Sequence, residues 1–169
     1  MNKISHVLTG AAALGALVAG IPTSYAVDFP TTTNTIENHH TGTCLGESGK
    51  QVRMYDCDGG ASVTWQIRET ANASGSMIRN STSTSCLDND GANVYLSDCN
   101  TSDLGQRWFV WGCPSHIVSR LAYERDPNSA YLTGWNAGTV SVSNNNSLKS
   151  EWISSGWGCE SAGHVTLPG

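Results

Sequence analysis

The sequence has little charge, few bulky aromatics and, beyond its first residues, no long apolar run. Of 169 residues only 14% are charged, and 9 Lys and Arg stand against 14 Asp and Glu. This balance argues against a nucleic-acid ligand and against attachment to an anionic membrane, since both need clustered basic side chains. The chain also lacks a Cys-x-x-Cys pair, which disfavours a zinc site. It lacks sustained helical periodicity as well, which disfavours a helical fold.

The first 26 residues are typical of a secretory signal. Lys3 provides a charged start, an apolar segment follows from Ile4 to Ile21, and Ser24-Tyr25-Ala26 offers a small-residue cleavage site. A retained membrane anchor is the weaker interpretation, because glycines and Thr9 interrupt the segment. The sequence therefore predicts a secreted, extracellular protein with a bacterial type of signal.

Three similar sequence segments recur along the rest of the chain, and each ends in a tryptophan. Trp65, Trp108 and Trp152 are 43 and 44 residues apart. In the first two segments a pair of cysteines precedes the tryptophan, and Cys57 follows Cys44 by 13 positions, as Cys99 follows Cys86. A period in this range indicates repeated units that stack to bury a shared core.

The even number of cysteines, 6, predicts three disulfides in an exported chain. The repeat pairs Cys44 with Cys57 and Cys86 with Cys99, each within its own unit. Cys113 and Cys159 remain, and both follow a Trp-Gly dipeptide. Their bridge would enclose the third unit, which has no cysteine pair of its own.

Short β-rich runs alternate with turn-forming residues from position 36 onward, which predicts an all-β domain. The expected strands are 51–55, 63–68, 77–80, 93–96, 108–111, 117–121 and 139–142. Propeller blades have a similar period but need about four or more copies. Three units favour a β-trefoil over residues 36–169, in which the three tryptophans fill one core. Residues 27–35 are expected to form an extended N-terminal arm.

The second unit carries the phrase Cys86-Leu87-Asp88, Asp98-Cys99 and Gln106-Arg107-Trp108. Because the cysteines and the tryptophan occur together at these spacings, the chain resembles the ricin B-type β-trefoil lectins. The resemblance implies shallow pockets for galactose-type or related sugars, one on each lobe. Each pocket uses an Asp two places after the first cysteine, an aromatic two places before the second, and an Asn or His three places before the tryptophan.

No lobe keeps this full set. The first has the aromatic Tyr55, but Gly46 and Ser62 stand at the other places. The second has Asp88, with Ser97 and Gly105 at the remaining two, and Gln106 is expected to be mainly structural. Tyr95 alternates with buried neighbours and is expected to face water beside Asp88. The third lobe has Thr133 and Lys149. The candidate sugar-binding residues are therefore Asp88, Tyr95, Gln106 and Tyr55.

Nothing in the sequence indicates catalysis, a metal or a cofactor. The histidines (His39, His40, His116 and His164) are scattered, and the carboxylates beside Cys57 and Asn89 fall in turns, where capping the backbone is the common role. Trp135 lies outside the repeated register in a Gly-bracketed turn. It is a candidate partner contact, and its alternative role is a lid over the barrel.

The sequence thus predicts a secreted, non-enzymatic recognition module. The favoured hypothesis is an adaptor or delivery subunit of an extracellular, toxin-type assembly, because the sugar pockets are degenerate. A carbohydrate-binding lectin is the alternative, and an inhibitor of an extracellular hydrolase is a more distant one. The expected partner is another secreted protein, a glycan or both.

Overall fold

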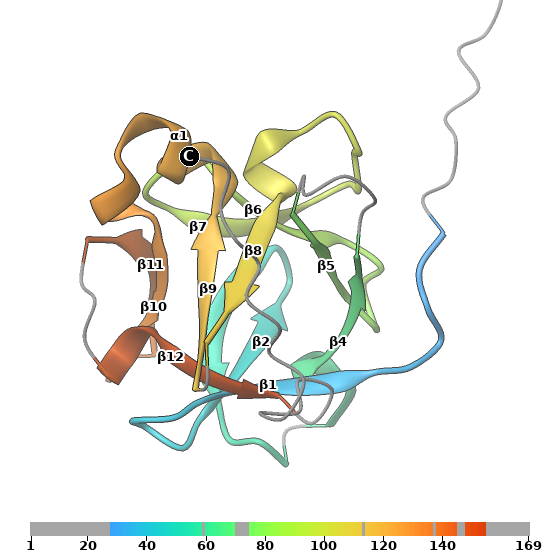
Figure 1. Cartoon of the computed structure of the whole chain (residues 1–169). Coiled ribbons are helices and arrows are strands. Elements are labelled where there is room, and N and C mark those ends of the chain that lie inside the picture. Colours follow the sequence, from blue (N-terminus) through green and yellow to red (C-terminus); the bar gives the residue numbers. More distant parts are fainter. Residues whose placement is uncertain are drawn as a thin grey trace, which may run out of the picture.

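The computed structural model describes residues 28–58, 60–69, 75–112, 114–136, 138–144 and 148–154. The predicted signal, Cys113 and Cys159 lie outside these residues. The described chain is almost entirely β-structure (Figure 1). Its strands are β1 (Asn34–Asn38), β2 (Cys44–Ser48), β3 (Gln51–Tyr55), β4 (Thr64–Arg68), β5 (Met77–Asn80), β6 (Cys86–Asn89), β7 (Val94–Ser97), β8 (Trp108–Trp111), β9 (Ser115–Ser119), β10 (Tyr131–Gly134), β11 (Val140–Ser143) and β12 (Glu151–Ser154). The predicted all-β class is confirmed.

Three lobes of four strands each build a closed barrel. The first and the fourth strand of every lobe together form the ring of the barrel, in the order β1, β4, β5, β8, β9, β12. The joint between β5 and β8 is a bridge in which Ser76 and Trp108 exchange backbone hydrogen bonds of 2.7 and 2.9 Å. β12 then pairs with β1, which brings Ile36 opposite Ser154 and closes the ring.

The second and third strands of each lobe form a hairpin, and the three hairpins cap one end of the barrel. Equivalent backbone bonds join them in a cycle: Leu96 N–H donates to Lys50 O (3.1 Å), Val142 N–H to Ala92 O (2.8 Å), and Met54 N–H to Gly138 O (3.0 Å). Each hairpin is therefore bonded to both of the others. This is the triangular cap of a β-trefoil, as predicted.

The three repeated tryptophans occupy one core and are fully buried. Each indole N–H donates to the carbonyl of a leucine in the second strand of its own lobe. The bonds are Trp65 to Leu45 (2.8 Å), Trp108 to Leu87 (2.9 Å) and Trp152 to Leu132 (3.0 Å). The indole supplies apolar volume, and its one polar group is satisfied, so the residue is well suited to a buried site. The predicted threefold core is confirmed.

The third lobe departs from the repeat directly after its first strand. A strand was expected over 117–121, but β9 ends at Ser119 and helix α1 (Arg120–Arg125) follows. Ser119 caps the helix by accepting the N–H of Ala122 at 3.1 Å. A helix of six residues is too short to show the periodicity by which sequence reasoning would find it. The described residues also form four 3₁₀ turns: η1 (Gly60–Val63), η2 (Leu104–Gln106), η3 (Pro127–Ser129) and η4 (Leu148–Ser150).

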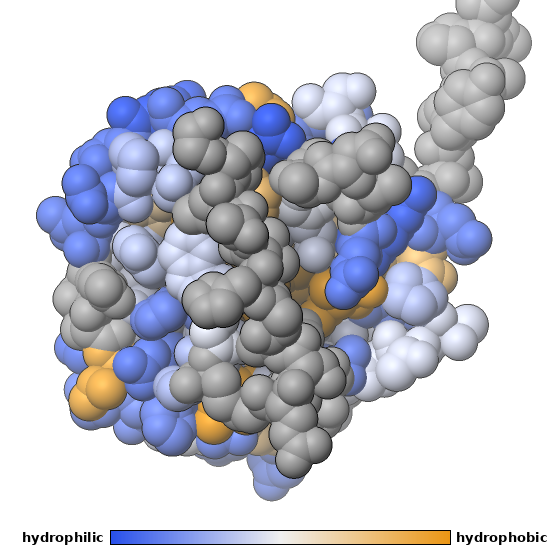
Figure 2. Space-filling view, in the orientation of Figure 1, coloured by the Kyte–Doolittle hydropathy of each residue, from blue (hydrophilic) through white to orange (hydrophobic). Residues whose placement is uncertain are grey.

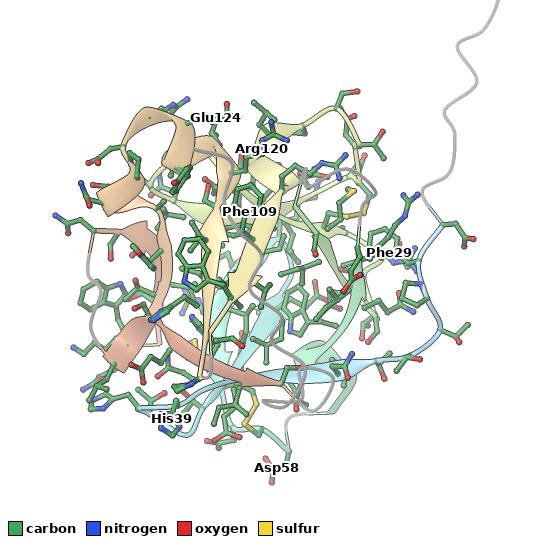
Figure 3. The ribbon with its side chains drawn as sticks, in the orientation of Figure 1. Phe29, His39, Asp58, Phe109, Arg120 and Glu124 are labelled. Atoms are coloured by element: carbon green, nitrogen blue, oxygen red, sulfur yellow. A yellow bond between two sulfur atoms is a disulfide. The ribbon has the colours of Figure 1, made fainter. Side chains whose placement is uncertain are left out.

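The N-terminal arm is docked on the second lobe. Phe29 is buried against Met77, Cys86 and Cys99, and the Arg79 guanidinium lies 4.3 Å from the centre of its ring. Figure 3 shows Phe29 on the flank of the barrel beside β4 and β5. β1 begins at Asn34, two residues before the predicted domain start. The arm therefore belongs to the folded domain as far as Phe29.

Both intra-lobe disulfides have formed, Cys44–Cys57 and Cys86–Cys99, with Cα atoms 4.9 and 5.0 Å apart. No helix among the described residues is long and apolar enough to cross a membrane. In Figure 2 the coloured surface is mostly hydrophilic, and apolar residues form small separate areas.

We expect Trp→Ala at position 65, 108 or 152 to lower the free energy of unfolding by about 3–5 kcal/mol, because each change empties a large buried volume. A domain of ordinary stability, about 5–15 kcal/mol, would lose much of its margin. Urea denaturation followed by circular dichroism measures the loss. Ile153→Ala, at a side chain 40% exposed, is the control and should change the stability little.

We also expect a third bridge between Cys113 and Cys159. Peptide mapping of the purified, oxidised chain without reduction should find all three pairs and no free thiol. Removing this bridge would release a loop of the third lobe and cost about 3–4 kcal/mol in the chain-entropy account. A bridge that linked the first lobe to the second would contradict the repeat.

Candidate recognition sites

The second lobe keeps the most complete remnant of a polar pocket, centred on Asp88. Asp88 lies in β6 directly opposite Tyr95 of β7, so both side chains stand on the same face of the hairpin. Asp88 is only 3% exposed. It accepts Ser97 Oγ–H at 2.5 Å, Asn89 N–H at 2.7 Å and Gln106 Nε2–H at 3.4 Å. Its acceptor capacity is therefore largely used by the protein itself.

Gln106 holds the end of β7 in place. Its Nε2 donates to Ser97 Oγ at 2.6 Å and to Asp98 O at 2.9 Å, while its Oε1 accepts Asn100 N–H at 2.8 Å. The residue is 1% exposed. These contacts tie the end of β7 to the turn that follows it.

Gly105 closes the pocket from the other side. An added Cβ at this position would lie 2.3 Å from Asp88 Oδ1 and 2.4 Å from Asn89 O, so no larger residue fits without displacing backbone. The Gly105 carbonyl accepts Asn89 Nδ2–H at 2.6 Å. The place at which the resemblance implies a sugar-binding Asn thus has no room for one.

Asn89 makes a hydrogen bond that the third lobe lacks the side chain to make. In the other two lobes an amide at the end of the opening strand donates to the carbonyl three places before a tryptophan: Asn38 to Lys149 O at 2.7 Å and Asn80 to Ser62 O at 2.9 Å. Ser119 stands at that place in the third lobe. It donates instead to Asn89 Oδ1 at 2.9 Å, and Asn89 supplies the missing amide.

Burial is the main cause that raises the pKa of Asp88 above its ordinary value of 3.8, and the Asp103 charge adds to it. The bonds from Ser97, Gln106 and Asn89 act in the opposite direction. Burial likewise raises the pKa of the Tyr95 hydroxyl, with contributions from the nearby carboxylates of Asp88, Asp90 and Asp103. The surface beside Tyr95 is therefore acidic, and Tyr95 itself is 37% exposed.

The first lobe's pocket position is filled by its own aromatic. A Cβ added at Gly46 would lie 2.6 Å from Tyr55 Cδ2 and 2.9 Å from Val63 Cγ1. The Tyr55 ring therefore covers the backbone at the place where a carboxylate would stand. The position keeps a stacking surface but has no acid to orient a sugar.

The third lobe's position is closed by two hydroxyl groups. Thr133 Oγ1 donates to Tyr131 O at 3.1 Å and lies 3.0 Å from Ser143 Oγ. Thr133 is fully buried.

Trp135 lies beside a separate groove of about 380 Å³ between the β1–β2 turn and the β10–β11 turn. His40, Thr41 and Thr43 line one side, and Asn136 and Gly138 continue the side of Trp135. Met54 of β3 completes the lining. Trp135 is partly exposed, and its Nε1 donates to Ser141 Oγ at 2.8 Å.

The structure brings together Asp88, Tyr95 and Gln106 and keeps Tyr55 and Trp135 apart from them. Sequence reasoning missed the groove because its two sides belong to the first and the third lobe and lie far apart in the sequence. Trp135 was the available signal, as an aromatic outside the repeat. Among the described residues, no group of three or more His, Cys, Asp or Glu could hold a metal ion.

The profile of the ricin-type β-trefoil lectin domain matches residues 28–121, more than half of the chain. This chain is a ricin-type β-trefoil lectin domain. The matched part covers the first two lobes and the start of the third, which is the lobe that has lost its internal cysteines. A comparison with curated protein sequences finds no match.

Solved structures with the same fold include SeviL bound to asialo-GM1 saccharide (TM-score 0.59, 16% identity, 72% of this chain and 94% of that one). The designed threefold-symmetric protein ThreeFoil is similar (TM-score 0.59, 19% identity, 72% and 96%). A mosquitocidal holotoxin is also similar (TM-score 0.60, 17% identity, 76% of this chain but 17% of that one). At these identities the likeness shows the fold alone.

In this ricin-type domain we expect Asp88→Asn to change how stability depends on pH. Because the folded-state pKa of Asp88 is raised, the folded state binds a proton more tightly than the unfolded state between pH 3.8 and the folded-state pKa. The free energy of unfolding contributed by Asp88 is therefore highest at low pH and falls as pH rises through this window. Because one proton is involved, the free energy of unfolding contributed by Asp88 changes by at most about 1.4 kcal/mol per pH unit.

Urea unfolding of both proteins at a series of pH values from about 3 to 7 measures this effect. The stability of Asp88→Asn relative to wild type should rise across the window and then level off. Parallel curves would show that Asp88 has the same pKa in both states.

Proposed function

We propose that this chain is an exported, non-enzymatic adaptor or delivery subunit that binds another extracellular protein. The observation that carries the proposal is the closure of the three family sugar positions. Asp88 is buried under Ser97 and Gln106, Tyr55 covers Gly46, and Thr133 is bonded to Ser143. A domain that has kept its fold and closed these pockets is available for another kind of recognition.

Two further features support this function. The similarity to part of a mosquitocidal holotoxin shows that the same fold can occur within a larger toxin protein. The described surface also carries an exposed aromatic: Tyr95, 37% exposed on the capping hairpins beside an acidic surface. Tyrosine gives a large contact area with few torsions to freeze, which makes it a frequent anchor at protein interfaces. We assign the partner contact to the face around Tyr95, and acidic neighbours favour a basic partner surface.

A lectin function of the second lobe is the second candidate. It is favoured by the juxtaposition of Asp88 and Tyr95, which pair across the hairpin and could offer a carboxylate and a stacking ring to one sugar. Binding would require Ser97 and Gln106 to release the carboxylate. A charge-assisted hydrogen bond of about 1.5–3 kcal/mol would then be a large share of a millimolar affinity near 4 kcal/mol.

Two variants separate these functions. The tagged exported chain is used to capture proteins from the culture medium of its host, and the affinity for the captured protein is then measured with purified components. On the adaptor function, Tyr95→Ala should weaken this affinity at least about tenfold, the loss expected for an anchor residue. Asp88→Asn should leave it unchanged.

Ile153→Ala is the matched control, because it also shortens an exposed apolar side chain, 40% exposed and on the barrel rather than the cap. The same proteins are tested on a glycan array. If a simple sugar bound at millimolar affinity or better, and the binding vanished in both Asp88→Asn and Tyr95→Ala, the lectin function would replace the adaptor.

A further inference from the structure

We propose that Arg68, Arg107 and Arg120 form a binding site for a tetrahedral oxyanion of the phosphate type. The three side chains come from three parts of the chain: Arg68 ends β4, Arg107 directly precedes β8, and Arg120 begins α1. The site uses none of the residues assigned above to the partner contact or to the family sugar positions. It therefore does not rest on the adaptor function.

Arg107 has a buried guanidinium group with an unused hydrogen-bond donor. The residue is 8% exposed. Its Nη2 donates to Thr101 O, but its Nη1 is buried and has no acceptor among the described residues. Burial of a charged donor without a partner is costly, and such groups are rare in folded proteins. An anion that accepts a hydrogen bond from Nη1 would remove this cost.

Arg68 lies in the same row of side chains as Arg107. In the β4–β5 ladder Arg68 is directly opposite Met77, which packs outside the barrel core. The bridge at the start of β8 joins Ser76 to Trp108. Arg107 precedes that tryptophan and therefore lies beside Met77 on the next strand. Because directly opposed residues share a face of a sheet, both arginines stand on the outer face of the barrel, on either side of Met77.

The three positive charges lie close enough to act on one another. Burial is the main cause that lowers the pKa of Arg107, and the charges of Arg120 and Arg68 lower this pKa further. The backbone N–H of Arg120 also donates to Arg107 O at 2.9 Å, which fixes the start of α1 beside this residue. The chain as a whole has a net charge of −5, so this cluster is a local exception. A multiply charged anion would relieve the repulsion within it.

Little negative charge compensates this cluster. Arg120 Nε lies 2.9 Å from Glu124 Oε1 and forms an ion pair with it, and Figure 3 shows the two residues together at α1. Within the described part of the chain, no ion pair reaches Arg68 or Arg107. The side chain of Arg120 is 31% exposed, and Arg68 is partly exposed. The cluster therefore reaches solvent through these two side chains, and Arg107 forms its buried base.

The neighbouring arginine on the same flank of the barrel is satisfied within the chain. Arg79 directs Nε and Nη2 to Gln66 Oε1 at 2.9 and 2.5 Å. Arg53 Nη2 and Arg125 Nη1 likewise have acceptors, each at 2.9 Å. The unused donor of Arg107 is therefore a particular feature of this site and not a general property of the arginines in this protein.

The arrangement of the donors favours a phosphate group over a carboxylate. A carboxylate offers two oxygens in one plane and is matched by a single guanidinium fork. A phosphate group offers at least three acceptor oxygens that point in different directions, and it carries up to two negative charges. It can therefore accept hydrogen bonds from side chains that approach from three elements. The free ion and the phosphomonoester of a small molecule present the same group, so both fit the site.

The test measures binding of inorganic phosphate and of O-phosphoserine to the purified, oxidised chain by isothermal titration calorimetry, in a buffer free of phosphate and sulfate. We expect a dissociation constant of about 1 mM or lower in about 50 mM NaCl. It should rise about tenfold in about 500 mM NaCl, because salt screens the exposed charges. Binding of one probe alone would identify the free ion or the ester as the ligand, and either result supports the site.

Thermal unfolding gives a second measurement. At a phosphate concentration about ten times the dissociation constant, the midpoint should rise by about 3–8 °C relative to NaCl of equal ionic strength. Phosphate also stabilises proteins in general, because it is excluded from their surface. The variants separate the two effects, since the general effect does not depend on any one side chain.

Arg107→Met keeps much of the length of the side chain, removes its charge, and should abolish binding. Arg68→Gln changes a partly exposed side chain, so the variant should fold, and it should weaken binding at least about fivefold. Glu124→Gln removes the carboxylate that competes for Arg120 and should strengthen binding at least about twofold. Arg53→Gln, at an exposed arginine of the first lobe, is the matched control and should bind like wild type.

Three results would each overturn the proposal. One is the absence of binding of both probes at about 20 mM. Another is binding that persists unchanged in Arg68→Gln and in folded Arg107→Met. The third is an equal rise of the unfolding midpoint in wild type and in these two variants. Capture of a protein partner through Tyr95 is measured separately and should persist in Arg68→Gln, so failure of this site and failure of the adaptor function are distinguishable.

Discussion

The hydrogen bond from each core indole to a leucine carbonyl is the constraint on which the rest of this trefoil depends. Trp65, Trp108 and Trp152 each place one polar atom in a fully buried core, and each atom has a partner in its own lobe at 2.8–3.0 Å. Because an unpaired buried donor would cost roughly 1–3 kcal/mol, the bond fixes how deep and at which angle each hairpin docks on its lobe. These three contacts hold each capping hairpin to the barrel strand of its own lobe.

A change in one lobe has altered the binding surface of its neighbour. Where the first two lobes use Asn38 and Asn80 to satisfy a buried carbonyl, the third has Ser119, which begins helix α1. Asn89 supplies the missing amide to Gly105 O. This draws Asn89 and Gly105 together beneath Asp88, and the space for a further side chain disappears. The closed pocket of the second lobe is thus coupled to the helix in the third.

The sequence predicted the features that repeat. The spacing of the cysteines and tryptophans was sufficient for the three lobes, for the disulfides Cys44–Cys57 and Cys86–Cys99, and for the buried core. It was not sufficient for α1, because a single capped turn of helix has no periodicity. It was also insufficient for the docking of Phe29 and for the groove at Trp135, since both depend on contacts between lobes that the chain brings together only when the barrel closes.

The pairing of β1 with β12 determines when this chain can fold. The barrel ring is complete only when Glu37 meets Ile153, a partner more than a hundred residues later in the sequence. Native closure must therefore wait for synthesis of almost the whole domain, and topologies with such distant pairings fold slowly. Until then β1 and β9, the two partners of β12, present unpaired strand edges, the kind of surface that associates with other chains. A nascent chain of this design depends on protection during translation more than a helical domain of equal length does.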